Sequence, residues 1–429
     1  MKTPRRDALK YLIRGAVLAP VAGLGIAVGL GPSAVERQRK LARAENIPLL
    51  PEDLHHASTV SDAENAALPL RALTQYWADI SESESHAWEN ASSQVNKHPE
   101  DMAALMVFLD GLEQYPEIFE LVEEAARRPH CDFQYDGSQG FDLMFSEFAV
   151  TRSVGRLLAA RAQLAAIAEN TFADIARIAR LGNLLWETPV SEAFLTGATL
   201  QSLASNVYVD TVRRFGPSPI AHKVLAEFHP APDLTFSFQG DVVFTLIVMK
   251  LLREGKLRTS EDSEPLSNVW NGPSDLAFFA RDYWEERVIL YWREFYAILR
   301  STKYIDERVK RMEAFEERLH KDNYFQKFLN LVASILGPHY GGELLESLRN
   351  LETKRSFRET ALQLLETKAA TGAFPTHPTP ARDPYSGKPL LYRREEDGCV
   401  FWSVGPNRKD DGGVELSSDK KILDLVVRL

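Results

Sequence analysis

The amino-acid sequence predicts a mainly α-helical protein, an irregular multi-helix array with a small C-terminal antiparallel β-hairpin module and an N-terminal membrane or signal helix. Three patterns lead to this prediction. Apolar residues recur at helical spacing through the centre, an Asp-Gly turn separates two strand-like runs near the end, and a basic segment precedes an apolar stretch at the start. We therefore divide the chain into a signal or anchor (1–34), a linker (35–65), a helical body (66–372) and a β-hairpin module (373–429).

Composition narrows the possible functions. The chain has 429 residues and a formal net charge of −10 at pH 7. A surface of this sign repels phosphate backbones, and the body of the chain shows no basic patch, so we expect no nucleic-acid partner. Cys131 and Cys399 stand far apart and no Cys-x-x-Cys occurs, which excludes a thiolate zinc site. The two cysteines form a disulfide if the chain is exported, or remain two separate buried thiols, which we favour.

The N-terminus predicts export or anchoring. Five basic residues and one acid occupy positions 1–14, and residues 15–31 are uncharged and mostly apolar. This order is typical of a secretory signal or a signal anchor, although a spanning helix needs about 20 apolar residues. Arg5-Arg6-Asp7-Ala8-Leu9-Lys10 resembles a twin-arginine export signal. We expect a single-pass inner-membrane anchor or export to the periplasm, with membrane contact through this segment.

Helical spacing of apolar residues runs through the body. The segment Pro99-Glu100-Asp101 is typical of a helix start, because proline fits the first turn and acids there oppose the helix dipole. Asn170-Thr171 is expected to separate two of the clearest helices. Short connections between such helices place them antiparallel as neighbours. The helices that we expect span residues 99–112, 115–128, 143–169, 172–186, 191–214, 219–228, 274–300, 306–321, 324–336 and 356–370, with 241–254 forming a helix or a strand.

The body offers few candidates for chemistry. The chain has no HExxH, no GxSxG and no glycine-rich phosphate loop. His130 and Cys131 are adjacent, but a Cys–His nucleophile pair needs spatial contact and a third orienting group, which adjacency does not supply. The aromatic run 283–295 lines a groove, or Trp284, Ile289, Trp292 and Phe295 form one packed helix face, which we favour.

The C-terminal module contains the most specific local pattern. Asp397-Gly398 lies between strands expected at 390–394 and 399–404, and this dipeptide is a strong hairpin signal. A third strand is expected at 422–427. The loop before it carries Asp410 and Asp411 beside two glycines, and with a backbone carbonyl near Ser403 these acids are candidate calcium ligands. The alternative, a solvated acidic turn without metal, is the one that we favour.

Residues 383–413 carry a resemblance. They have the order Asp-Pro, Gly, an aromatic strand and Ser-x-Gly, and this order is similar to the C-terminal region of type II secretion major pseudopilins, which precedes a calcium loop. The chain departs from those proteins at Asn407, where they have Asp, and at Pro32, where their filament-forming helix would continue. The chain therefore is not itself a pilin. Beyond residue 45 the chain resembles uncharacterised bacterial envelope proteins with a helical body and this pseudopilin-like tail, and that resemblance implies architecture without any activity. It rests on residues 62–67, 123–131, 150–186 and the tail from 383.

These observations favour a non-enzymatic envelope interaction or scaffold protein with a protein partner, stabilised by calcium at the C-terminal loop if the metal binds there. The alternative is an exported hydrolase or ligand-binding enzyme with a site between helices of the body, around Trp284 and Trp292. A deep pocket with several convergent polar groups would favour the enzyme.

Overall fold

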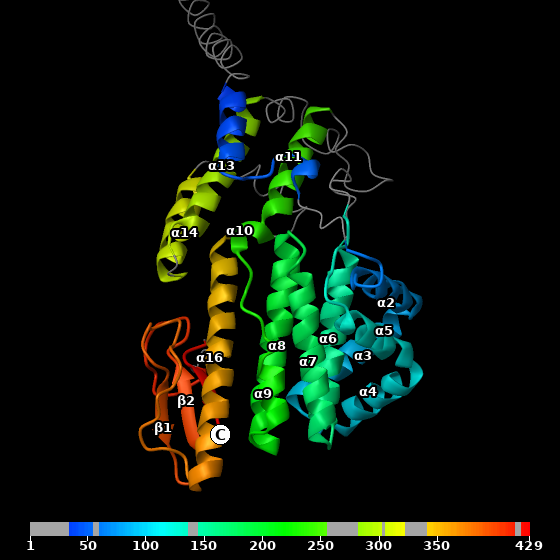
Figure 1. Ribbon diagram of the computed structural model, residues 1–429, viewed down its shortest axis with the longest axis vertical. Coiled ribbons are helices and arrows are strands. Elements are labelled where there is room, and N and C mark those ends of the chain that lie inside the picture. The colour runs from blue at the N-terminus through cyan, green and yellow to red at the C-terminus, as the bar shows by residue number, and fades with distance from the viewer. Residues whose placement is uncertain are drawn as a thin grey trace, which may run out of the picture.

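The computed structural model describes residues 34–54, 60–135, 145–254, 282–302, 305–321, 341–416 and 422–429. The described residues form thirteen α-helices and a small three-stranded antiparallel sheet near the C-terminus (Figure 1), which confirms the mainly helical fold class. The predicted N-terminal membrane helix falls on residues that lie outside this description.

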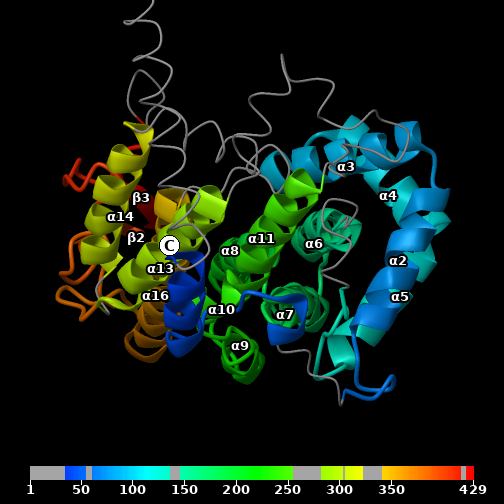
Figure 2. The same ribbon diagram turned by 90° about the horizontal axis from the view of Figure 1, so that it is seen from above.

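Four helices form one side of the body, beyond α6 in Figure 2. They are α2 (Ala67–Asp79), α3 (Glu82–Lys97), α4 (Met102–Gln114) and α5 (Pro116–Arg127). The helix expected from Pro99 begins three residues later, at Met102, because Asp101 is the cap. Its carboxylate accepts hydrogen bonds from the N–H groups of Ala103 and Ala104, both at 3.1 Å, and satisfies donors that have no partner inside the helix.

The centre of the fold is a set of long neighbouring helices, α6 (Ser146–Leu164), α7 (Ala168–Leu185) and α8 (Ser191–Phe215), followed by the short α9 (Pro219–Leu225). The predicted break at Asn170-Thr171 is wrong, since both residues lie inside α7. The Thr171 hydroxyl donates to the carbonyl of Ile167 at 3.2 Å, so its polar group is satisfied within the helix. The chain turns at residues 165–167 instead.

A second helical layer contains α10 (Leu234–Ser237), α11 (Gln239–Arg253), α13 (Asp282–Arg300), α14 (Ile305–His320) and α16 (Gly341–Thr371). The segment 241–254, which the sequence allowed as a helix or a strand, is helical in α11. The last helix begins fifteen residues earlier than the expected start at 356, and it packs along α8 (Figure 1). The helix predicted at 324–336 lies outside the described residues.

Part of the segment expected as a linker is structured. Residues 34–44 are helical, and the side chains of Val35 and Ala42 are buried in one core with α13. They are seven positions apart, which puts them on one face of a helix. Two ion pairs to α13 hold this segment, Arg39 of the helix to Glu285 and Glu45, just after its end, to Arg293.

One helical stretch within the described ranges, Leu234–Leu251, has the length and composition to cross a membrane. Of this stretch, 67% is buried inside the fold, a value that a core helix also shows. It is weak support for a membrane span and leaves the predicted localisation open.

The C-terminal sheet has the order β1-β2-β3, with β1 (Leu391–Arg394), β2 (Cys399–Ser403) and β3 (Leu425–Arg428). The predicted hairpin is confirmed: Arg394 pairs with Cys399, and the Asp397-Gly398 turn closes it. All of β2 is buried. Its Phe401 ring meets Phe357 of α16 edge-on, with centroids 5.7 Å apart, so the sheet is attached to the longest helix.

Asp383 connects the start of this module to β2. Its side chain is 1% exposed. The carboxylate accepts five hydrogen bonds, from the hydroxyl of Ser403 at 2.6 Å, the hydroxyl and N–H of Ser386, and the N–H groups of Tyr385 and Val404. Hydrogen bonds to an ionised acceptor are about twice as strong as neutral ones. The Asp-Pro-Tyr-Ser-Gly segment is therefore fixed to the end of β2 by one buried charge.

We expect Asp383→Ala to lower the free energy of unfolding by about 2–4 kcal/mol, because several buried donors lose their acceptor. Ser386→Ala removes one donor, the hydroxyl, and keeps both its own N–H and the carboxylate, so it should cost about 1 kcal/mol. Urea unfolding followed by tryptophan fluorescence measures both. A loss below about 0.5 kcal/mol for Asp383→Ala would contradict the role given to this carboxylate.

Candidate functional site

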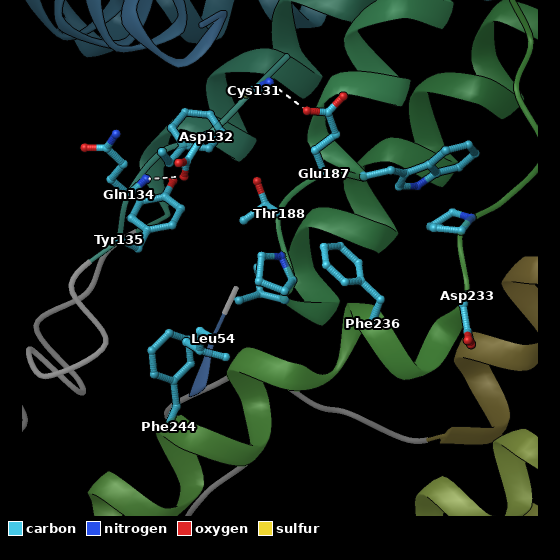
Figure 3. Close-up of a pocket in the computed structure, with 15 residues that line it drawn as sticks. Leu54, Cys131, Asp132, Gln134, Tyr135, Glu187, Thr188, Asp233, Phe236 and Phe244 are labelled. Atoms are coloured by element: carbon cyan, nitrogen blue, oxygen red, sulfur yellow. Dashed lines mark hydrogen bonds between the residues drawn. The ribbon is translucent and has the colours of Figure 1, made fainter. Parts of the chain in front are cut away.

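A cavity of about 590 Å³ lies between the segment that follows α5 and the turn that joins α7 to α8 (Figure 3). In this view Thr188 lies between Tyr135 on one side and Phe236 on the other. Cavities of roughly 300–1,000 Å³ are typical of small-molecule sites. The lining residues are Leu54, Cys131, Asp132, Phe133, Gln134, Tyr135, Trp186, Glu187, Thr188, Pro189, Val190, Pro232, Asp233, Phe236 and Phe244.

Hydrogen bonds from distant residues fix the segment 131–135. Asn65 donates from Nδ2 to the carbonyl of Asp132 at 2.8 Å, and its Oδ1 accepts the N–H of Asp132 at 2.9 Å. The N–H of Cys131 donates to Oε2 of Glu187 at 2.9 Å. Because backbone groups on this extended segment are satisfied by side chains, its position relative to the α7–α8 turn is fixed.

The opposite wall is attached to the same turn through α11. Asp241 accepts the N–H of Ser191 at 2.9 Å and its hydroxyl at 2.6 Å, which caps the N-terminus of α8 from another helix. The N–H of Gly240 donates to the carbonyl of Pro189 at 2.7 Å. A Cβ on Gly240 would lie 2.8 Å from that oxygen, so this close approach requires glycine.

Aromatic rings form one side of the cavity. Phe133 and Tyr135 stack with centroids 5.2 Å apart, and Phe148 meets both rings edge-on from α6. The Tyr135 hydroxyl donates to Glu147 at 3.2 Å. Burial, with the nearby Glu147 charge, raises the pKa of Tyr135 far above its usual range, so this hydroxyl keeps its proton. The rings present a rigid apolar surface with one neutral polar edge.

The polar groups of the cavity are acidic or neutral. Asp132 and Glu187 contribute carboxylates, and none of the fifteen lining residues is lysine, arginine or histidine. The Asp233 carboxylate points away from the hollow in Figure 3 and caps α10 through the N–H of Thr235 at 3.0 Å. Among the lining residues, the charges that face the hollow are the carboxylates of Asp132 and Glu187, which favour a cation, while Arg71, which donates to the Phe133 carbonyl, opposes it in part.

Two buried oxygens of this cavity have no hydrogen-bond partner among the described residues. They are Oδ2 of Asp132 and Oγ1 of Thr188. The other carboxylate oxygen of Asp132 accepts the N–H of Gln134 at 2.9 Å. Buried polar atoms are paired in most proteins, and an unpaired one costs about 1–3 kcal/mol. A ligand with hydrogen-bond donors would supply the missing partners.

The arrangement around Cys131 does not activate a nucleophile. Its thiol is buried, and desolvation, with the nearby Glu187 and Asp132 charges, raises the thiol pKa well above the ordinary value. The neighbouring His130 directs Nδ1 towards Glu187, with 3.5 Å between His130 Nδ1 and Glu187 Oε2, and it is more than half exposed. This geometry does not supply the contact that a Cys–His pair requires.

The aromatic run of α13 is a packed helix face. Ile289, Trp292 and Phe295 are at most 5% exposed and belong to one core. Trp284 is outside the side chains that the structure describes. For the described residues the packed-face interpretation is therefore the better one. The cavity of Figure 3 lies away from this helix, which borders a separate cavity of about 620 Å³ at Glu285 and Ile289.

The candidate calcium ligands have partners within the protein. Oδ1 of Asp410 accepts Nε1 of Trp402 at 3.0 Å, Oδ2 of Asp411 accepts Nδ2 of Asn407 at 2.6 Å, and the Ser403 hydroxyl donates to Asp383. In the ranges that the structure covers, no group of three or more His, Cys, Asp or Glu side chains is placed to hold a metal ion. Residues 417–421 of the same loop fall outside those ranges. Calcium at this loop stays a prediction.

Sequence reasoning named Cys131 but missed Asp132, Thr188 and Glu187. The signal was weak: Thr188-Pro189 reads as an ordinary helix connection. Only the fold brings that connection beside residues more than fifty positions earlier.

No family model matches the chain, and no characterised protein or solved structure matches it at a significant level. The resemblance to envelope proteins with a pseudopilin-like tail stays a prediction.

Cys131 and Cys399 are both free and buried, as the favoured interpretation of the sequence expects. Desolvation raises the pKa of Cys399 to about 11, and that of Cys131 is raised as well.

We expect neither thiol to react with iodoacetamide at pH 8 in the folded protein, because only the thiolate attacks and the thiolate appears as pH approaches the raised pKa. Mass spectrometry of native and urea-unfolded samples tests this expectation. Rapid labelling of native Cys131 at pH 7 would contradict it.

Proposed function

We propose that this protein is a non-enzymatic binding protein whose cavity takes a small organic cation, an amine attached to an apolar or aromatic body. The observation that carries this proposal is the pair of unpartnered buried oxygens, Asp132 Oδ2 and Thr188 Oγ1, in an aromatic cavity. An ammonium group is a donor without acceptors, and it supplies both hydrogen bonds and a compensating charge.

The physical match extends to the rest of the lining. Carboxylates of Asp132 and Glu187 attract a cation, and aromatic faces stabilise an ammonium group by about 0.5–2 kcal/mol through the ring quadrupole. Phe133, Tyr135 and Phe236 also give the apolar part of such a ligand a dry surface. The same carboxylates would repel an anionic ligand, and this repulsion is a source of specificity.

Binding is favoured over catalysis because of what surrounds the reactive candidates. The thiol of Cys131 is held neutral, and its N–H, not its sulfur, contacts Glu187. A nucleophile needs a nearby base and an oriented third group. The enzyme alternative of the sequence analysis therefore gains a cavity from the structure but no activated group among the described residues.

The N-terminal sequence supports a proposal for where the protein is located. We propose that the chain is exported or anchored in the cell envelope, with the cavity outside the cytoplasm, on the basis of the basic and apolar leader. An envelope site exposes the cavity to small solutes that arrive from outside the cell.

Phenethylamine is a suitable probe, and 2-phenylethanol is its neutral counterpart of similar size. We expect calorimetry to show that the amine binds at least about tenfold more tightly than the alcohol, because only the amine is charged. Asp132→Asn should weaken amine binding by about 10–100-fold, the value of a hydrogen bond to a charged group. Thr188→Val should weaken it less, by about tenfold or under.

Asp79→Asn is the control for Asp132→Asn, since Asp79 is an exposed acid at the end of α2 and distant in sequence from the lining residues. It should leave both affinities unchanged. Equal binding of amine and alcohol, or equal loss in the control and the Asp132 variant, would contradict an organic cation as the ligand.

A second candidate function is the interaction or scaffold role expected from the sequence. Helix α4 exposes four large apolar side chains, Met102 and Met106 by more than 60%, and Val107 and Leu109 by more than 40%. Asp110 and Glu113 lie beside them on the same helix. This surface fits an amphipathic helix of a protein partner whose apolar face is bordered by basic residues.

The double substitution Met102→Lys and Met106→Lys tests the α4 surface without disturbing the core. We expect a cross-linked partner in solubilised envelope to be lost from this variant, because lysine removes the apolar contact and repels a basic border. Ile167→Lys changes an apolar side chain of similar exposure elsewhere and should keep the partner. Quantitative mass spectrometry compares the proteins cross-linked to the wild type, to the double variant and to Ile167→Lys. An identical set of cross-linked proteins in all three samples would contradict the role of α4.

A further inference from the structure

A second cavity, of about 460 Å³, lies between α8, α13, α14 and α16, on the other side of the loop 229–233. Figure 1 shows α16 beside α8, with α13 and α14 above them. Pro232 and Asp233 border both cavities. The linings differ in charge. The second cavity is lined by four arginines from three helices, Arg300, Arg308, Arg355 and Arg358, with Glu352 and Asp233 as its acids.

Positive charge exceeds negative charge in this lining. Arg300 donates to the carbonyl of Glu45 at 2.6 Å, and Arg308 donates to the carbonyl of Thr302. Within the described part of the chain, neither arginine forms an ion pair with a carboxylate. Arg355 does form one, to Glu359 at 2.8 Å. Carbonyl groups accept a hydrogen bond but carry no full charge, so the cavity keeps a positive potential.

Arg358 is the most informative of the four. Its side chain is buried, with the residue 4% exposed, and Nη1 donates to the Ser205 hydroxyl. The guanidinium carbon lies 3.8 Å from the centroid of the Phe228 ring. Nε has no hydrogen-bond partner among the described residues, and the guanidinium group forms no ion pair with any of their carboxylates. Burial lowers its pKa to about 9, an unusual cost for a guanidinium.

Arg349 on the same helix provides the comparison. It is 1% exposed, but it is ion-paired with Asp306 at 2.6 Å and with Glu346 at 3.0 Å. A buried charge is tolerated when it is paired, and it is costly when it is not. The fold therefore supplies Arg349 with its counterions and leaves Arg358 facing a cavity.

We propose that this cavity binds the oxyanion group of a small molecule, a phosphate or a carboxylate, with Arg358 as the central contact and Arg308 and Arg300 around it. Guanidinium groups match such oxygens in geometry as well as in charge. Glu352 and Asp233 are the two acids of this lining and oppose an anion in part, while the four arginines outnumber them. This second site goes beyond the cation cavity and does not depend on it.

The test measures the melting temperature of the full chain with sodium phosphate, sodium acetate or sodium chloride at equal ionic strength. We expect phosphate or acetate, but not chloride, to raise it, since a ligand that binds the folded state stabilises that state. A response to phosphate alone identifies a phosphate site, and a response to acetate alone identifies a carboxylate site. Equal responses to all three salts would show screening and overturn the proposal.

Substitutions then locate the effect. Arg358→Met should weaken anion binding at least tenfold while leaving the melting temperature without anion equal or higher, because it removes an unpaired buried charge. Arg308→Gln changes a partly exposed residue, so it keeps the test valid if the first variant does not fold, and it should also weaken binding. Arg127→Gln, an exposed arginine on α5, is the matched control and should respond like the wild type. An undiminished response in Arg308→Gln and in a folded Arg358→Met would overturn the proposal.

Discussion

The close contact between α7 and α8 is the constraint on which both cavities depend. Gly182 and Gly197 face each other there: a Cβ on Gly182 would lie 3.0 Å from the Gly197 carbonyl, and one on Gly197 would lie 2.8 Å from the Gly182 carbonyl. Backbones can approach this closely only where both residues lack a side chain. Gln201 reinforces the contact, because its Nε2 donates to the Ala179 carbonyl at 2.7 Å. The turn at residues 186–190, one wall of the first cavity, follows directly from this pairing.

The loop 229–233 separates two environments of opposite charge. On one side, Asp132 and Glu187 lie among aromatic rings without any base among the described lining residues, and on the other Arg358 lies among further arginines. Each side leaves buried polar atoms without a partner among the described residues, two oxygens in the first cavity and a nitrogen in the second. The linings of the two cavities therefore differ in charge, although Pro232 and Asp233 of the loop border both.

The C-terminal module illustrates how a specific local pattern can have a structural purpose. The aspartate of the Asp-Pro-Tyr-Ser-Gly segment is used internally, because it accepts hydrogen bonds from Ser403 and from backbone N–H groups. Asp424 has the same role further on, accepting the N–H of Gly413 at 2.8 Å. These carboxylates hold the loops of the module by hydrogen bonds, while the apolar side chains of β2, Cys399 and Phe401, join the main core of the body.

The sequence by itself determined the mainly helical class and the C-terminal hairpin, because both depend on local information: apolar spacing, capping residues such as Asp101, and the Asp397-Gly398 turn. It misplaced the break between the central helices, since Thr171 can satisfy its hydroxyl inside a helix as well as at a cap. The cavities were decided by the tertiary structure alone. The fold brings Asp132 and Thr188, which are distant in sequence, to the lining of one cavity, and it leaves Arg358 without a counterion among the described residues. No spacing rule along a chain determines which buried groups remain unpaired.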